Sequence, residues 1–359
     1  MYMKKLFRFK FLFFSLAAVA AVVWFWRSDS LNFEVKNKNT AGLTSGVSGE
    51  SGDLKLNVPE EKNILKGSLS GLDCENKNRR PYAAMLAGDP QTRPLSGISE
   101  ADIVVEMPVT PSINRFMAVY QCGEPKEIGS VRSSRDDFIP LAAGFDAVYA
   151  HWGGSHFALD KLNTGIIDNI DALKNPHNAF YRKEGIPAPD NGFTSDGRLS
   201  SAAKKLGYRQ KSEFEGYWRG EDKTAGGKKA VLEINYPGTY AVKYEYYPNT
   251  NVYLRFRGGK PEIDRNSNTQ VAAKNIAIMK TAIRPLEDQY NDVDVEGSGA
   301  AFVYRDGEEI KGRWKKDAKN LAAKLYFYGE GGEEIIFTPG SVWIEIVDAV
   351  VQTSWRLTD

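Results

Sequence analysis

Apolar positions divide the chain into an N-terminal apolar run, a polar segment, and a long region in which short apolar stretches alternate with turns. Residues 11–26 are almost entirely apolar, with Ser15 as the one polar member, and four basic residues precede them: Lys4, Lys5, Arg8 and Lys10. A basic end followed by such a run is typical of a secretory signal or an uncleaved signal anchor. We therefore expect residues 1–28 to form a signal anchor, or transmembrane helix, with everything after it exported.

The sequence favours retention of this helix over its cleavage. A small-x-small signature occurs at residues 18–20, but cutting there would leave the apolar residues 22–26 at the mature N-terminus. Trp24 and Trp26 beside Arg27 also resemble an aromatic belt at the outer membrane interface. We expect a single-pass protein of the cell membrane with an extracytoplasmic soluble part, and a cleaved signal is the alternative. No cysteine stands at the end of the run to accept a lipid.

Residues 29–66 differ in composition from the rest of the chain. The stretch 42–52 is rich in Ser, Gly and Thr, and it has too little apolar surface to offset the entropy of ordering. We expect a disordered tether there.

Residues 67–207 show strand-length apolar stretches in alternation with helical patterns. Strands are predicted at 82–87, 102–106, 116–121 and 147–151, and helices at 138–144 and 157–163. Such alternation favours a mixed or partly parallel sheet covered by helices, and therefore an N-terminal α/β domain.

Residues 228–359 contain short, often alternating segments separated by turn signals such as Pro237-Gly238 and Pro339-Gly340. Strands are predicted at 230–235, 241–247, 251–256, 275–279, 299–304, 308–314, 325–328 and 342–347. This spacing indicates a mostly antiparallel, β-rich domain, joined to the first by an interdomain segment at 208–227. The predicted fold class is therefore α+β.

Composition narrows the possible partners. The chain has 359 residues and a formal net charge of +1, which argues against nucleic acid as a partner. Its two cysteines, Cys74 and Cys122, would lie in an oxidising compartment, where a pair indicates a candidate disulfide. The alternative is two unpaired thiols.

The densest group of chemically competent side chains lies between residues 93 and 155. Arg132 and Arg135 flank two serines and could hold a phosphate or carboxylate, and a Gly-Gly-Ser turn entering a helix offers backbone N–H groups. The alternative is a set of structural ion pairs and an ordinary N-cap. The candidate anion-binding residues are Arg93, Asp102, Glu106, Arg115, Arg132, Ser133, Arg135, His151, Gly153, Gly154 and Ser155.

The sequence does not match the familiar catalytic and metal-binding motifs. Residues 153–157 lack the closing glycine of a nucleophile elbow, and Val303 stands where a calcium loop beginning at Asp292 would need glutamate. The three histidines have no metal-ligand spacing, and there is no P-loop or dinucleotide fingerprint. We predict no metal and no cofactor, and the residues leave open whether the protein is an enzyme.

Ordered blocks at 93–104, 113–120, 128–135 and 151–155 resemble the YerB family of bacterial envelope proteins, and so do blocks at 252–256, 271–275 and 338–344. The resemblance covers nearly everything after residue 66, but it implies no reaction, because the family has no known activity. Members often begin as lipoproteins, whereas this chain has an apolar run without an acceptor cysteine. Asp190 stands near a place where the family tends to have a Pro-His-Asn turn.

Two functions are compatible with these features. The first is a binding or scaffold module of the envelope that is held by its N-terminal helix and recognises a cell-wall component or an envelope protein. The second is an enzyme or binder that acts on phosphorylated lipid-linked cell-wall precursors through an arginine-lined anion pocket. The Arg-Ser-Ser-Arg-Asp segment at 132–136 is similar in arrangement to the LytR-CpsA-Psr phosphotransferases, which favours the second by analogy alone.

Overall fold

The computed structural model describes residues 68–222, 227–287 and 289–358. The predicted signal anchor and tether lie outside these ranges, so they stay predictions. Within the described ranges, no helix combines the length and the apolarity needed to span a membrane.

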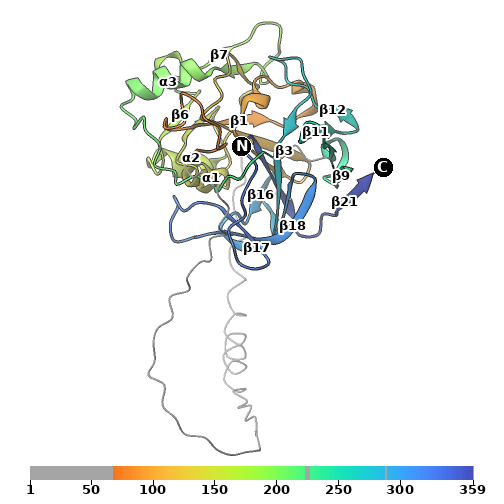
Figure 1. Ribbon diagram of the computed structural model, residues 1–359. Helices are drawn as coiled ribbons and strands as arrows, with labels where there is room; N and C mark the ends of the chain where they lie inside the picture. The colour runs from red at the N-terminus through yellow and green to blue at the C-terminus, as the bar shows by residue number, and fades with distance from the viewer. Residues whose placement is uncertain (1–67, 223–226, 288, 359) are drawn as a thin grey trace, which may run out of the picture. The chain divides into compact units, whose positions relative to one another are not determined.

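A ten-stranded sheet runs through the described region in the order β19-β18-β17-β14-β20-β2-β3-β1-β5-β6 (Figure 1). In that order the strands span Tyr326–Gly329, Glu308–Lys316, Gly297–Arg305, Asn275–Thr281, Val342–Asp348, Ile103–Thr110, Ile113–Tyr120, Tyr82–Ala87, Val148–His151 and Asn169–Asp171. β20 pairs in parallel with both β14 and β2. The β2–β20 hydrogen bonds therefore cross from one predicted domain to the other.

A second sheet, β12-β11-β10-β9-β21, has β13 paired to β11. These strands are Lys260–Pro261, Val252–Arg257, Val242–Tyr247, Lys229–Ile234, Thr353–Thr358 and Ala272–Ala273. In β10, buried and half-buried residues alternate, as expected when one face of a sheet packs on a core. Two small sheets complete the strands: β15 (Ile283–Leu286) with β16 (Tyr290–Val293), and β4 (Ile128–Gly129) with β8 (Gly192–Thr194) and β7 (Tyr181–Arg182).

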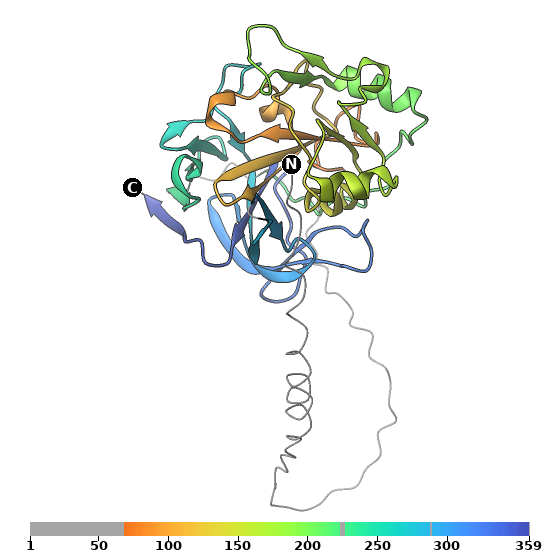
Figure 2. The ribbon, with the colours of Figure 1, turned by 180° about the vertical axis from the view of Figure 1, so that it is seen from behind.

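The three α-helices among the described residues are α1 (Phe138–Gly144), α2 (His156–Asn163) and α3 (Asp196–Lys205), and they gather at the β5–β6 end of the large sheet (Figure 2). Side chains cap two of them. Ser155 accepts a hydrogen bond from the Ala158 amide, and Ser195 accepts one from the Arg198 amide. Four short 3-10 helices lie at Pro90–Thr92, Ile98–Glu100, Pro176–Asn178 and Gly238–Tyr240.

The large sheet has a separate apolar core on each face. Leu86 and Phe116 belong to the core shared with the second sheet and α3, whereas the neighbouring Met85 and Met117 belong to the core shared with α1 and α2. Adjacent residues of a strand point to opposite faces, so the sequence alternation decides which core each one enters. Side chains one residue apart in β2 or β3 are therefore separated by the sheet.

The β-rich character predicted from the sequence is confirmed, because strands predominate over helices among the described residues. The division into an α/β domain and a β domain stays a prediction. Helix α3 and the β15–β16 hairpin were not predicted. Only Asp196, Leu199, Ala202 and Ala203 of α3 are buried, so its sequence lacks a strong apolar stripe.

A disulfide joins Cys74 to Cys122, with 5.7 Å between the two Cα atoms. Asp102, just before β2, stabilises the chain around Cys122. Its Oδ2 accepts hydrogen bonds from the Gln121 and Cys122 amides at 2.6 and 2.9 Å. Asp102 is therefore a structural residue at the end of β3, away from the arginines with which the sequence grouped it.

Replacing both cysteines with serine should lower the free energy of unfolding by about 2–4 kcal/mol, because the bridge closes a loop between residues 48 positions apart. Thermal or urea unfolding of the purified protein measures this loss. Dithiothreitol should reproduce it in the wild type and leave the double variant unchanged, whereas equal stability of the two proteins would contradict the prediction.

Candidate anion-binding site

The carboxyl ends of three parallel strands, β1, β5 and β6, meet at one edge of the large sheet. Ligands of open sheets that contain parallel strands commonly bind at such an edge. The segment Arg132–Arg135 lies along it, because the Arg132 amide donates to the Met85 carbonyl at 2.9 Å and the Ser134 amide donates to the Gly153 carbonyl at 2.9 Å. Backbone hydrogen bonds thus place this segment beside the end of β1 and the turn after β5.

Arg115, on β3, is the buried centre of a three-arginine cluster formed with Arg132 and Arg135. It is 7% exposed, and its Nη1 donates to the Ser133 carbonyl at 2.8 Å, while its Nε has no hydrogen-bond partner. Among the described residues, no carboxylate forms an ion pair with it. Burial, together with repulsion from Arg135, lowers the pKa of Arg115 to about 9.

The other two arginines have different partners. Arg132 forms an ion pair with Asp190, and Asp89 lies 3.6 Å from its Nη2. Arg135 donates to the Ser134 carbonyl at 2.9 Å and lies over the Tyr290 ring, 5.1 Å from its centroid. Burial lowers the pKa of Arg135 as well. Both carboxylates therefore contact Arg132, and among the described residues no carboxylate forms an ion pair with Arg115 or Arg135.

The Gly-Gly-Ser turn after β5 is held by protein contacts. The Gly153 amide donates to Asp171 at 2.9 Å, and Ser155 is the N-cap of α2. Buried His151 has both ring nitrogens within hydrogen-bond distance of protein oxygens, 2.8 Å from the Gly153 carbonyl and 3.2 Å from Asn169. Gly154 forms a bridge with Ser134. The turn therefore shapes the cluster, while the arginines supply its charge.

The sheet separates two predicted residues, Arg93 and Glu106, from this cluster. Glu106 on β2 is paired with Phe116 in the strand register, whereas Arg115 is paired with Met107, so the two charged side chains point to opposite faces. Glu106 is fully buried and forms ion pairs with Arg255 and Arg257 of β11. The sequence predicted one site, and the structure divides its residues between the two faces.

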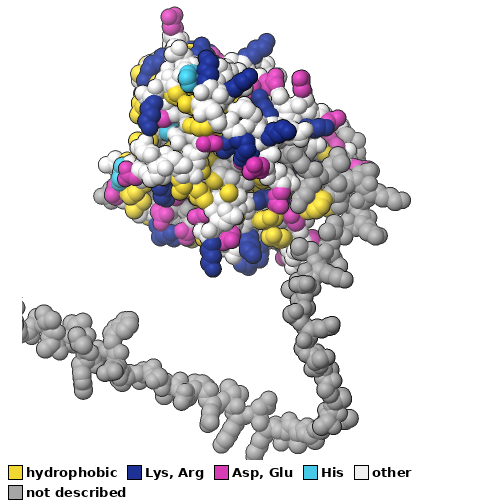
Figure 3. All heavy atoms as spheres, turned by 90° about the vertical axis from the view of Figure 1, so that its left-hand side faces the viewer, with side chains coloured by type: hydrophobic (Ala, Val, Ile, Leu, Met, Phe, Trp, Pro, Cys, Tyr) yellow, Lys and Arg dark blue, Asp and Glu magenta, His cyan; other side chains and the backbone are white. Residues whose placement is uncertain are grey.

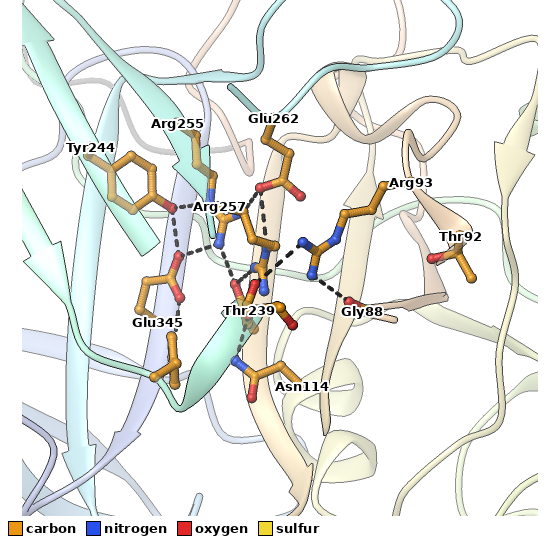
Figure 4. A network of polar contacts seen from close by, with 12 residues as sticks. Gly88, Thr92, Arg93, Asn114, Thr239, Tyr244, Arg255, Arg257, Glu262 and Glu345 are labelled. Atoms are coloured by element: carbon orange, nitrogen blue, oxygen red, sulfur yellow. Dashed lines mark hydrogen bonds and ion pairs between the residues drawn. The ribbon is translucent and has the colours of Figure 1, made fainter. Parts of the chain in front are cut away.

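Figure 4 shows the network on the second face, which joins β2, β11 and β20. Arg255 donates from Nε to Tyr244 at 2.8 Å and contacts Glu345 at 3.2 Å, and it also forms an ion pair with Glu262. Asn114 donates to Glu106 at 2.7 Å. Sequence reasoning missed the four network residues Arg255, Arg257, Glu262 and Glu345. One sequence signal was available for the two arginines: Arg255 and Arg257 flank Phe256 at the end of a predicted strand.

Burial and charge act differently on the two central carboxylates. Burial and the neighbouring charge of Glu106 raise the pKa of Glu345 to about 7. Burial would raise the pKa of Glu106 too, but Arg257 and Arg255 hold it below its usual value. Glu106 is thus the ionised member of the pair, and Glu345 is the member that takes up a proton.

Arg93 lies at the edge of this network. It donates to the Gly88 carbonyl at 2.8 Å and lies over the Tyr240 ring, 5.7 Å from its centroid. On the face of the molecule in Figure 3, basic and acidic side chains are interspersed. On this face, attraction for an anion therefore depends on local arrangements of arginines.

We expect Glu106→Gln to cost about 3–5 kcal/mol of unfolding free energy at pH 7, because it leaves buried arginines without their carboxylate. Chemical unfolding measures the loss. Glu345→Gln is the matched comparison. It should lower the unfolding free energy much less at pH 7, since burial already disfavours the charged form of Glu345. Equal losses for the two variants would contradict the charge assignment.

The same assignment predicts a pH dependence. A carboxyl whose folded pKa is raised from 4.5 to about 7 favours the folded state below pH 4.5 and loses that contribution as the pH rises through 7. Unfolding free energies measured from pH 4.5 to 8 should therefore decline less in Glu345→Gln than in the wild type. Parallel curves would show that Glu345 does not titrate in this range.

Comparisons with known proteins place the chain in a family. Residues 69–209 match the model described as the N-terminal domain of a protein of unknown function, DUF3048, and residues 232–344 match its C-terminal domain. The "Putative lipoprotein YerB" of Bacillus subtilis is 31% identical over 297 residues, which cover 81% of this chain and 88% of that protein. A crystal structure of YerB from Bacillus subtilis matches with a TM-score of 0.73 and 31% identity, over 81% of this chain and 99% of the crystallised one. The chain therefore belongs to the DUF3048, or YerB-like, family.

Proposed function

We propose that this protein is a binding module of the cell envelope that recognises a phosphate or carboxylate group through Arg115, Arg132 and Arg135. The observation that carries the proposal is Arg115, a buried guanidinium without a carboxylate partner among the described residues. The apolar run at residues 11–26 and the name of the Bacillus subtilis relative, a lipoprotein, support a location at the outer side of the membrane.

A bound anion would compensate the unpaired positive charge of this cluster. A buried charge without a partner is costly, and a guanidinium matches the oxygens of phosphate and carboxylate groups. The next two acids along the chain do not neutralise the cluster: Asp136 contacts Lys161 at 3.2 Å, and burial raises the pKa of Asp137 to about 8. The arginines therefore retain an excess positive charge near neutral pH.

The side chains around the arginines favour binding over catalysis. A hydrolase or transferase of the common kind needs a nucleophile beside a base. Ser134 is buried, and its hydroxyl lies 2.9 Å from that of Tyr149, while both ring nitrogens of His151 face protein oxygens. A second candidate function, an enzyme or binder acting on phosphorylated lipid-linked cell-wall precursors, is favoured by the fit of several guanidinium groups to a diphosphate.

Calorimetric titration of the detergent-solubilised full chain with pyrophosphate tests the binding proposal. Arg135→Gln should weaken binding by about 10- to 100-fold, because a hydrogen bond to a charged group contributes about 1.5–3 kcal/mol. Arg115→Gln should weaken it at least as much.

Arg313→Gln, a change at an exposed arginine on β18, is the matched control and should bind like the wild type. Absence of pyrophosphate binding, or equal losses for Arg135→Gln and Arg313→Gln, would refute the proposal. A titration with polyprenyl phosphate separates the second candidate, because that candidate alone requires a contribution from the lipid chain.

A further inference from the structure

A cleft of about 530 Å³ lies on the other side of the large sheet from the arginine cluster. One wall comes from residues 90–98, after β1, and the other from residues 257–263, around the β11–β12 turn. Hydrogen bonds hold the walls together, since the Arg265 amide donates to the Leu95 carbonyl at 2.7 Å and the Ser99 amide donates to Asp264 at 3.0 Å. The cleft is thus fixed by backbone contacts and has the size of a small-molecule site.

Two arginines line this cleft with unused donors. Arg257 is 3% exposed; its Nη2 forms an ion pair with Glu106 and its Nε lies 3.4 Å from Glu262, but its Nη1 has no hydrogen-bond partner. The Nε of Arg93 also lacks a partner. A buried guanidinium nitrogen without an acceptor is costly, and an acceptor brought by a ligand would remove that cost.

The balance of charge at the cleft favours an anion. Three basic groups line it, Arg93, Arg257 and the exposed Lys260, together with one acid, Glu262. That acid is shared with Arg255. Burial and the positive charge of Arg257 lower the pKa of Arg93 to about 10, which shows that guanidinium groups crowd together there and still leaves Arg93 charged at neutral pH.

The rest of the lining is apolar, which limits the kind of anion. The half-buried Ile263 and the exposed rings of Pro90, Pro94 and Pro261 contribute apolar surface, and Leu95 and Ile98 lie buried beneath it. A bare inorganic anion would leave this surface in contact with water, whereas an aliphatic group would cover it.

We propose that the cleft is a second ligand site, which binds a carboxylate attached to a small aliphatic body through Arg93 and Arg257. A short peptide ending in a free carboxylate and a short fatty acid share this chemistry. The site uses different arginines from the proposed anion site, because Arg257 is paired with Glu106 on one face of the large sheet and Arg115 lies on the other.

Titration of the full chain with acetyl-Ala-Ala and with octanoate tests this inference and distinguishes the two sources. At least one should bind, and the amide of the same ligand should bind at least 10-fold more weakly because it lacks the charge. Binding of neither carboxylate, or equal binding of the amide, would overturn the inference.

Variants on each side of the sheet localise the site. Arg93→Gln should weaken carboxylate binding at least 10-fold and leave pyrophosphate binding unchanged, and Arg135→Gln should do the reverse. Arg93 is only half-buried, so this variant should keep the wild-type melting temperature. Ile263→Ala provides a second readout, because it should weaken the binding of octanoate without removing a charge from the protein. Carboxylate binding unaffected by both Arg93→Gln and Ile263→Ala would place the ligand elsewhere and refute the proposed site.

Discussion

The packing of the two sheets depends on the buried guanidinium of Arg255. Glu106 and Glu345 face each other across the parallel pairing of β2 and β20, so two buried carboxyl groups meet between the sheets. Arg255, from β11 of the second sheet, contacts both. Replacing a buried ion pair with apolar groups can be neutral, but removing one partner is strongly destabilising. The packing of these strands therefore depends on every partner of the network being present.

This arrangement also separates the charged groups of the protein into two sets. Alternation along β2 and β3 sends Glu106 to the face covered by the second sheet and Arg115 to the face covered by α1 and α2. The first set is nearly balanced in charge and buried. The second set lies at the carboxyl ends of parallel strands, where Asp89 and Asp190 both contact Arg132 and leave Arg115 and Arg135 without an ion pair among the described residues. The same sheet thus carries a buried ion-pair network on one side, bordered by the cleft at Arg93 and Arg257, and a separate arginine cluster on the other.

Much of the fold could be predicted from the sequence, since turn signals and apolar runs predict β1 and α1 with their observed bounds. Part of the candidate site could be predicted too, because Arg132 and Arg135 lie in one short segment. The grouping of Glu106 with Arg115 was wrong, because spacing alone does not tell which face of a sheet a residue occupies. Arg255 was missed for a different reason: its partner Glu106 lies 149 positions away, and only the tertiary fold brings the two together.

The position of β20 has a consequence for how the chain matures. This strand, residues 342–348, lies between β14 and β2 near the middle of the large sheet, yet it follows every other strand of that sheet in the sequence. Until it emerges from the ribosome, β2 and β14 each present an unpaired edge, and such edges invite pairing with other chains. The large sheet can close only after residues 342–348 have been made, so a chain that lacks them would be prone to aggregate.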